Sequence, residues 1–369
     1  MNIVWLSWKD IHHPEAGGAE LVSDRIRQNL VKDGHTVTLL TASYASSKSV
    51  EKVNGVRTLR QGGKFSVYMK ARQSYKKISE PVDLIIDEMN TIPFFGCFYP
   101  GSAKKVLLTY QLARSVWFYQ IMFPLSIIGY TLEPLYLRLL SKRYALVLTE
   151  SESTKTDLQH YGFKAATIEV FRVGMETSRP AQLPNAPSSN SIVFLGALRP
   201  MKRPIDAIRA FESARDDNSA LTLTLAGNTN GSYAKKVIAY VAQSRHRDHI
   251  VMAGRVSEKE KTDLLRNADA ILVTSIKEGW GLIVTEANSQ GTPAVVYDAD
   301  GLRDSVLKDK TGKIVPSGDF AAMGATLNKL LKDPIQYSKI RKNAFEHSKQ
   351  FTFKNSYADF CSLLGMKKT

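Results

Sequence analysis

The chain has 369 residues, of which 43% are hydrophobic and 23% are charged, so it is an ordinary globular protein long enough for two domain cores. Its two cysteines, Cys97 and Cys361, match no disulfide or metal-binding spacing, which argues against a zinc site and fits a reducing cytoplasm. The formal net charge of +15 favours acidic partners, whether phosphorylated substrates, anionic lipid or nucleic acid.

In the first half of the chain, strand-like runs alternate with helix-length segments, the pattern of parallel sheets covered by helices on both faces. The N-terminus enters a strand without a preceding basic region and cleavage site, so we expect no signal peptide and a cytoplasmic protein. A helix is predicted from Gly18 to Val31, and Asp33-Gly34 ends it. The predicted strands of this half are 3–8, 36–41, 84–86, 105–109, 145–149 and 167–171.

A basic segment follows the second strand. Between residues 48 and 77 nine lysines and arginines accompany a single acidic residue, Glu51, with aromatic and apolar residues interleaved. This mixture can lie on an anionic membrane, and the alternative is a merely solvated basic face. Nucleic acid is not an expected partner, because the sequence contains no recognised binding module.

The most apolar tract runs from Val116 to Leu140. It is nearly long enough to span a bilayer, but Pro124, Gly129, Glu133 and Pro134 interrupt it. We therefore expect it to seat at a membrane interface, as an aromatic lip that admits a lipid. The alternative is a buried core helix.

The alternation stops between Gly174 and Ser191, where three prolines and almost no periodicity indicate an interdomain linker. It restarts after the linker. The predicted strands are 192–195, 221–226, 250–252, 271–274, 294–297 and 313–315. We therefore expect two α/β domains, residues 1–174 and 191–350, each with a parallel sheet.

One motif sets two carboxylates eight residues apart. Residues 278–286 read E-G-W-G-L-I-V-T-E, which places Glu278 in a loop and Glu286 about one turn inside a helix that Gly291 and Pro293 end. A four-residue loop reaches roughly 13 Å and four helical residues rise about 6 Å, so both carboxylates can line one pocket. Gly279 and Gly281 let the backbone approach a ligand. The alternative is a pair of solvated surface glutamates.

Two strand-to-helix turns offer groups that suit phosphate. Gly17 and Gly18 open the first helix, whose free amides can receive phosphate oxygens, although a double glycine is also plain turn chemistry. The second turn, Gly196 to Lys202, places Arg199 and Lys202 at a helix entrance, where cations complement phosphate groups. A solvated pair of cations is the alternative.

The 278–286 motif, the G-T-P-A-V-V run after it and the G-G-A-E loop at 17–20 resemble the signatures of family 4 retaining glycosyltransferases (glycosyl transferases group 1). The resemblance covers nearly the whole chain and is weakest in residues 44–80. It implies the GT-B architecture, two Rossmann-like domains facing across a cleft, with a final helix near 352–365 that packs back on the N-terminal domain.

The resemblance also implies roles for the donor site. Glu278 would contact the donor sugar near its anomeric carbon, and Glu286 would bind the ribose hydroxyls. Lys202 would bind the pyrophosphate, and Arg199 takes the role of an arginine that commonly follows the glycine, where this chain has Ala197. The candidate catalytic residues are thus Glu278, Lys202 and Arg199. The donor-binding set adds Gly17, Gly18, Gly196, Gly279, Trp280, Gly281, Leu282 and Glu286.

The acceptor side departs from the family pattern. Many relatives carry a histidine near the donor sugar where this chain has Tyr110, and Gln111 and Arg114 are the candidates to replace it. Asp87 and Asn90 follow a strand and are expected to face the acceptor hydroxyl. His12 and His13 either edge the acceptor pocket or lie on the surface.

No metal and no cofactor are expected. The D-x-D triplet Asp298-Ala-Asp300 follows a strand of the second domain, where two loop aspartates are routine, and a retaining transfer needs no protein base.

The sequence thus favours a retaining hexosyltransferase. It would move a sugar from a nucleotide diphosphate sugar, UDP being favoured, to a glycan or lipid-linked acceptor. The setting would be cell-surface polysaccharide or glycolipid synthesis at the inner face of the cell membrane. A nucleotide-sugar epimerase of the same architecture and a non-catalytic sugar-nucleotide-binding protein are the alternatives.

Overall fold

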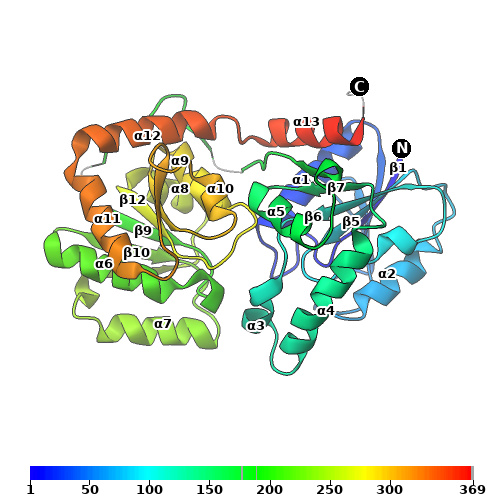
Figure 1. The fold of residues 1–369 in the computed structure, drawn as a ribbon, viewed down its shortest axis with the longest axis horizontal. Helices are drawn as coiled ribbons and strands as arrows, with labels where there is room; N and C mark the ends of the chain where they lie inside the picture. The colour runs from blue at the N-terminus through cyan, green and yellow to red at the C-terminus, as the bar shows by residue number, and fades with distance from the viewer. Residues whose placement is uncertain (176–177, 188, 367–369) are drawn as a thin grey trace. The chain divides into compact units, whose positions relative to one another are not determined.

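The computed structural model describes residues 1–175, 178–187 and 189–366. The chain divides into two compact units (Figure 1). The N-terminal unit comprises Met1–Gly174 together with the chain from Thr352 onward, and the C-terminal unit comprises Met175–Phe351.

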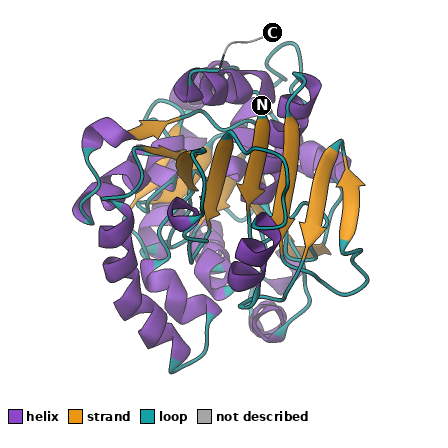
Figure 2. Ribbon diagram, turned by 90° about the vertical axis from the view of Figure 1, so that its right-hand side faces the viewer, coloured by secondary structure: helices purple, strands orange, loops and turns teal. Residues whose placement is uncertain are grey.

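The N-terminal unit is built on one twisted sheet. Among its described residues this sheet has eight strands in the order β3-β4-β2-β1-β5-β6-β7-β8, and every neighbouring pair is parallel except β3 with β4. Figure 2 shows these strands side by side with helices packed against them. The strands are β1 (Asn2–Leu6), β2 (Thr36–Thr41), β3 (Val50–Val53), β4 (Val56–Arg60), β5 (Leu84–Met89), β6 (Lys104–Thr109), β7 (Leu146–Thr149) and β8 (Ile168–Val170).

The helices of this unit cover the apolar faces of the strands. Along β1, Val4 and Leu6 join a cluster that includes Ala71 of α2, while Trp5, which points the other way, lies against Phe360 of α13. The helices are α1 (Gly18–Lys32), α2 (Val67–Tyr75), α3 (Trp117–Gln120), α4 (Leu125–Leu140), α5 (Glu152–His160) and α13 (Phe353–Leu364), with 3-10 turns η1 (Gly96–Phe98), η2 (Arg114–Val116) and η3 (Ala165–Thr167).

The last helix, α13, belongs to the N-terminal unit. The ring of Phe360 stacks on Trp5 with centroids 5.8 Å apart, and the Tyr357 hydroxyl donates to Asp33 over 2.6 Å. Asp359 binds the Arg172 guanidinium through two contacts of 2.6 Å. These contacts join the end of the chain to β1, to the end of α1 and to the segment after β8.

The basic segment 48–77 does not form one surface. Its first part is a β-hairpin, β3–β4, which was absent from the predicted strands although Asn54-Gly55 is a strong two-residue turn signal. Arg60 is buried and binds the carboxylates of Asp10 and Glu51, and Tyr75 is buried as well. Alternation in a strand sends neighbouring side chains to opposite faces, so the segment cannot present all its cations together.

The C-terminal unit has a second parallel sheet. Among its described residues the strand order is β11-β10-β9-β12-β13-β14, and all neighbouring pairs are parallel. The strands are β9 (Ser191–Leu195), β10 (Thr222–Ala226), β11 (Ile250–Gly254), β12 (Ala270–Val273), β13 (Ala294–Tyr297) and β14 (Gly312–Val315). The helices and 3-10 turns are η4 (Pro200–Lys202), α6 (Pro204–Asp217), α7 (Ser232–Gln243), η5 (Arg247–His249), α8 (Glu258–Asn267), α9 (Leu282–Ser289), α10 (Leu302–Ser305), α11 (Phe320–Lys332) and α12 (Pro334–Ser348).

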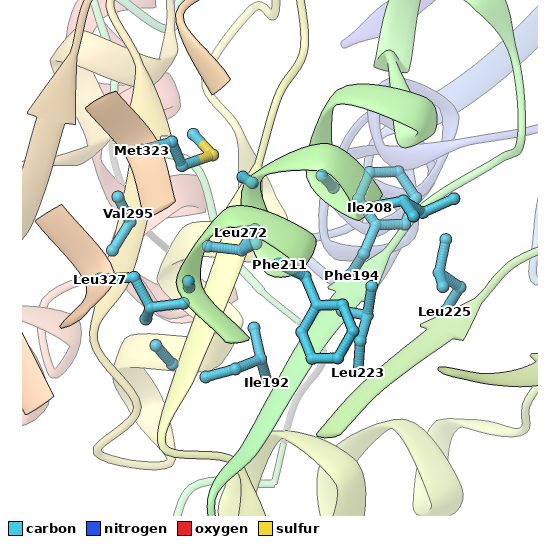
Figure 3. Packing of buried hydrophobic residues seen from close by; sticks show 14 of the residues in the cluster. Ile192, Phe194, Ile208, Phe211, Leu223, Leu225, Leu272, Val295, Met323 and Leu327 are labelled. Atoms are coloured by element: carbon cyan, nitrogen blue, oxygen red, sulfur yellow. The ribbon is translucent and has the colours of Figure 1, made fainter. Parts of the chain in front are cut away.

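One core cluster of this unit lies between the sheet and helices α6 and α11, and a second includes Leu265 of α8, Val284 of α9 and Leu302 of α10. Figure 3 shows Phe211 of α6 beside Phe194 and Leu223 of the strands, and Leu327 of α11 near Val295. The proline-rich segment 178–187 has no helix or strand and is attached to this unit, because the Arg341 guanidinium donates to the carbonyls of Pro184 and Asn185 over 3.1 Å each.

Candidate active site

The 278–286 motif has the predicted local structure. Strand β12 ends at Val273, a loop carries Glu278, and α9 begins at Leu282, so that Glu286 lies one turn inside the helix. Gly281 precedes α9 with a left-handed backbone, φ 89° and ψ 55°, and a Cβ added there would lie 2.9 Å from a methyl of Leu302. Only glycine fits this turn without strain, because L side chains disfavour that conformation.

Glu278 meets Lys202 across two separate segments. The Lys202 ammonium binds the Glu278 carboxylate, and the Ser275 hydroxyl donates to the same oxygen over 2.6 Å. The side chains of Lys202 and Glu278 are 28% and 16% exposed, so the charged pair is open to solvent on one side. The Thr274 hydroxyl donates to the Lys202 carbonyl over 2.8 Å, which holds the two loops together.

Arg199 and Gly196 lie in the same turn as Lys202. Arg199 is exposed, and among the described residues its guanidinium takes part in no ion pair. The amide of Gly196 donates to the Ala226 carbonyl over 3.0 Å, so this amide serves the sheet rather than a ligand. Gly196 can therefore contribute only by lacking a side chain, which lets a ligand approach the backbone closely.

Gly227 makes that turn possible, and this gives a test of stability. A Cβ at Gly227 would overlap the carbonyl oxygen of Gly196. We expect Gly227→Ala to lower the free energy of unfolding by about 1–3 kcal/mol or more, as overpacking does. The control is Gly196→Ala, whose Cβ would meet only Phe194 at 3.8 Å. Urea unfolding of both variants checks this, and equal midpoints would contradict the tight packing.

Glu286 is nearly buried and has a cation beside it. The Lys261 ammonium lies 2.8 Å from Glu286 and 2.7 Å from Glu258, both carboxylate contacts. Burial lowers the pKa of Lys261, but Coulombic attraction to Glu286 and hydrogen bonds to both carboxylates outweigh it, so the pKa is raised. Lys261 is thus charged and fixes one oxygen of Glu286.

The residues between the two glutamates are anchored. The Trp280 indole donates to the Thr285 hydroxyl over 2.8 Å, and its ring lies 5.1 Å from Phe351. Gly279 is half-buried, while Leu282 opens α9. Contacts with Thr285 of α9 and with Phe351, which lies shortly after α12, therefore fix the conformation of the loop.

The D-x-D carboxylates already have cationic partners. Asp298 binds Arg303 over 2.8 Å, and Asp300 binds Lys277 over 2.9 Å. Burial raises the pKa of Asp300, but the hydrogen bond and charge of Lys277 outweigh it, so the pKa is lowered. The carbonyl of Asp300 accepts from the Glu278 amide over 3.0 Å. This triplet shapes the Glu278 loop, and a metal ion would have to displace its partners.

In the N-terminal unit, Gly17 and Gly18 are exposed at the start of α1. The Glu20 carboxylate accepts from the Gly17 amide over 2.7 Å, lies 3.2 Å from Lys9 and accepts weakly from Asn90 over 3.4 Å. The following amides of the first turn have no intrahelical acceptor and remain suited to an anion. Asn90 therefore lies beside the G-G-A-E turn.

Asp87 is buried and fully engaged. It accepts hydrogen bonds from the amides of Phe94 and Gly96 and from the Tyr144 hydroxyl, over 2.9, 2.7 and 2.6 Å. Burial raises its pKa, and these three donors oppose that rise. Asp87 therefore fixes the chain after β5 and does not present its carboxylate to an acceptor.

Tyr110 is also buried. Its hydroxyl is 2.6 Å from the Ser23 hydroxyl, which donates to Glu88 over 2.9 Å, and the Trp5 indole donates to the same carboxylate oxygen over 2.6 Å. Burial raises the pKa of Glu88 to about 7. The position at which we expected a substitute for the histidine is thus part of an internal network.

The remaining acceptor candidates lie nearer the surface. Gln111 is half-buried. The Arg114 guanidinium lies 3.6 Å from Glu133 and over the ring of Tyr130 at 4.2 Å from its centroid. His12 is exposed, and the ring of His13 packs against Tyr44 with centroids 5.5 Å apart.

Comparison with known families agrees with this geometry. Residues 176–347 match the glycosyl transferases group 1, and residues 16–179 match Glycosyltransferase Family 4. The chain belongs to this group of glycosyltransferases. The first match contains Lys202, Glu278 and Glu286, and the second begins just before the G-G-A-E turn.

Relatives of this glycosyltransferase are distant. A D-inositol 3-phosphate glycosyltransferase of Jonesia denitrificans is 28% identical over 183 residues, which cover 48% of this chain and 43% of that protein. The matched segment thus spans less than half the length of that curated relative.

Solved structures share the fold over the whole chain. Sucrose-phosphate synthase from Thermosynechococcus elongatus has a TM-score of 0.80 at 18% identity and covers 99% of this chain and 98% of its own. Anabaena HepE, solved in complex with UDP-glucose, has a TM-score of 0.76 at 18% identity and covers 99% of each chain. The predicted GT-B class, with two Rossmann-like domains, is therefore confirmed.

The polar partners of the two glutamates were not predicted from the sequence. Ser275 contacts Glu278 from the loop after β12, and Lys261 contacts Glu286 from α8, 25 residues away. Ser275 precedes Glu278 by three residues and could have been noticed as a short-range partner. The sequence contained no signal for the pairing of Lys261 with Glu286, because that pairing depends on how α8 packs beside α9.

Glu286 gives a second testable expectation. Glu286→Ala should weaken UDP binding, because a charged acceptor for ribose hydroxyls contributes roughly 1.5–3 kcal/mol per hydrogen bond. Lys261→Met should weaken it less, since it leaves the carboxylate in place. Calorimetric titration of UDP into both variants and the wild type measures this. Wild-type affinity in Glu286→Ala would remove this residue from the nucleotide site.

Proposed function

We propose that this glycosyltransferase is a retaining enzyme that moves a hexosyl group from a UDP-sugar to a glycan or lipid-linked acceptor in cell-surface polysaccharide or glycolipid synthesis. The observation that supports it best is the solvent-open pair of Lys202 and Glu278, held by Ser275, in the loop that leads to Glu286. The C-terminal unit would thus bind the diphosphate through Lys202, the sugar through Glu278 and the ribose through Glu286.

In the proposed mechanism the donor diphosphate replaces Glu278 as the partner of Lys202. The diphosphate takes Lys202 as its partner, and Arg199, exposed in the same turn, adds a second cation. The bond from the anomeric carbon to the diphosphate oxygen breaks while the acceptor oxygen bonds to the same face of that carbon. The acceptor proton passes to the departing phosphate, so no protein base is required. Positioning and charge stabilisation supply the catalysis.

The choice of UDP rests on a neighbour and is tested directly. HepE, which shares the fold, was solved with UDP-glucose. A thermal-shift series over UDP-, GDP- and ADP-sugars should show the largest rise with a UDP-sugar, since ligand at a hundred times its Kd stabilises by about 2.7 kcal/mol. A larger rise with a GDP- or ADP-sugar would replace UDP in the proposal.

The transfer reaction and its stereochemistry need a product assay. With donor and acceptor together, NMR of the product should show the anomeric configuration of the donor. An inverted product would overturn the retaining mechanism. Conversion of the donor sugar without any acceptor would instead support the epimerase.

We also propose that the acceptor is used at the cytoplasmic membrane face. Among residues 1–175, 178–187 and 189–366, no helix is long and apolar enough to cross a bilayer. Attachment to a membrane surface is supported by the net charge of +15 and by the exposed apolar side chains of α3 and α4.

Metal independence is a separate expectation of this proposal. If Lys202, Arg199 and backbone amides neutralise the diphosphate, turnover should persist in excess EDTA. The reason is that the Asp298 and Asp300 carboxylates are already bound to Arg303 and Lys277. Loss of turnover with EDTA and its return with magnesium or manganese would restore these aspartates as metal ligands.

A further inference from the structure

Helices α3 and α4 form a hairpin with an unusually apolar surface. In Figure 1 they extend from the lower side of the N-terminal unit, away from its sheet. Met122 and Phe123, at the turn between them, are 86% and 78% exposed. The other exposed apolar residues of the hairpin are Phe118, Tyr119, Leu125, Ile127, Ile128, Tyr130, Leu132, Leu135 and Leu139. The alternative of a buried core helix is therefore wrong for this face.

Hydrogen bonds join the two helices of the hairpin to each other and to the turn that precedes α3. Glu133, buried in α4, accepts hydrogen bonds from the Trp117 indole over 2.9 Å and from the amides of Ala113 and Arg114 over 2.8 and 2.7 Å. Gly129 lies against the Trp117 ring so closely that an added Cβ would overlap it. Trp117 is consequently buried and serves as the anchor. The exposed apolar residues are thus held in place by the fold.

Polarity changes along the hairpin rather than around it. From Met122 to Leu132 the exposed side chains are apolar or aromatic on all sides except for Thr131. The Thr131 hydroxyl donates to the carbonyls of Ile127 and Ile128 over 3.0 Å, so it is satisfied within the helix. The exposed charges, Arg138, Lys142 and Arg143, lie only toward the other end.

This change in polarity along the hairpin distinguishes between two possible partners for its apolar surface, a second protein helix and a lipid bilayer. A second helix, such as α4 of another copy, needs an apolar stripe on one side and polar residues on the other. A bilayer needs an apolar tip and a polar base, as this hairpin has. Between Val116 and Thr149 the sequence has one acidic residue, Glu133, which is buried, so two copies would oppose cations with no exposed acid to balance them.

The tip also contains a hollow. An open cavity of about 530 Å³ is lined by Phe118, Tyr119, Ile121, Met122, Phe123 and Ile127, together with the small Ser126. Its volume is within the roughly 300–1,000 Å³ of small-molecule pockets, and its lining is mostly apolar. A hydrocarbon chain of a lipid is the ligand that this lining suits.

The dimensions favour shallow insertion. Leu125 and Arg138 are separated by about 20 Å along the helix axis, and one leaflet has about 15 Å of hydrocarbon. A tilted hairpin therefore enters one leaflet and leaves its cations at the headgroups. Anionic headgroups complement those cations.

We propose that the α3–α4 hairpin binds the membrane by inserting Met122 and Phe123 into an anionic phospholipid leaflet. The cavity at its tip would hold a lipid chain. The inference rests on the proposed function, because a lipid-linked acceptor is what such a seat would bring within reach. Of the two segments expected at a membrane, this hairpin and not the basic segment 48–77 then makes the contact.

The test is co-sedimentation with phosphatidylglycerol–phosphatidylcholine vesicles. Wild type should bind, and Met122→Asp/Phe123→Asp should lower the partition coefficient at least about tenfold, because two side chains no longer enter hydrocarbon. The matched control is Ile335→Asp on α12, since Ile335 is 82% exposed and should leave binding unchanged. Arg138→Glu/Lys142→Glu should weaken binding mainly at low salt.

Several outcomes would overturn the inference. These are failure of the wild type to bind vesicles, equal binding by the tip variant, and a wild-type dimer that the tip variant converts to a monomer. Wild-type melting temperature and UDP-induced thermal shift in the variant establish that it is folded. The UDP shift also separates the two proposals, because it tests the donor site in the absence of any vesicle.

Discussion

Lys202→Met should lower kcat by about 10²–10³-fold, the usual loss when one preorganised group that stabilises developing charge is removed. The leaving diphosphate gains negative charge as its bond to the sugar breaks, and Lys202 is the cation that the turn before α6 holds beside Glu278. Because Lys202 is 28% exposed, methionine fits its site without burying a polar group. We therefore expect the fold to be kept.

Steady-state kinetics with saturating UDP-sugar and acceptor measures this effect. Lys236→Met is the matched control, because Lys236 is an exposed lysine of α7 in the same unit. The control should have wild-type kcat. A Lys202→Met variant within about threefold of wild type would remove Lys202 from charge stabilisation, since that corresponds to less than about 1 kcal/mol of transition-state energy.

Glu278→Gln should lower kcat by about 10²-fold or more and leave UDP affinity unchanged or increased. The carboxylate matters most when positive charge develops at the anomeric carbon, so its loss is felt in the transition state rather than in binding. Glutamine can still accept the hydrogen bond from Ser275. Lys202, which is bound to Glu278 without ligand, becomes more available to the diphosphate.

Three measurements decide the role of Glu278. Calorimetry gives the UDP affinity and turnover gives kcat. The double variant with Lys202→Met gives the coupling energy between Glu278 and Lys202. Residues in contact are expected to be non-additive, so the double variant should lose less than the product of the two single losses. Weaker UDP binding with unchanged kcat would instead make Glu278 a nucleotide-binding residue.

The sequence by itself determined the secondary structure and the class of fold, because these depend on local order. Alternating apolar strands and helical spacing predicted nearly every strand of both sheets, and Gly281 and Gly291 mark the two ends of α9. The same local signal was present in Asn54-Gly55, whose hairpin was not predicted because charged residues interrupt the apolar pattern of its two short strands. The family motifs then identified the turns that carry Lys202, Glu278 and Glu286.

Only the tertiary structure decided which partner each polar group has. Asp87 lies near the carboxyl end of β5 and Tyr110 directly follows β6, yet Tyr144 and Ser23 from other elements engage them in the interior. Lys261 reaches Glu286 because α8 packs beside α9. Spacing in one segment cannot reveal such contacts, since they join faces that meet only when helices pack on a sheet.

Exposure of the α3–α4 hairpin was decided in the same way. An apolar helix has the same sequence pattern whether a second layer covers it or not, and the outer face of α4 is uncovered while Glu133, Leu137 and Leu140 on its inner face are buried. The sequence therefore determined that the hairpin is apolar. The packing of the unit determined which of its side chains face outward, because burial depends on what lies opposite a side chain and not on the side chain itself.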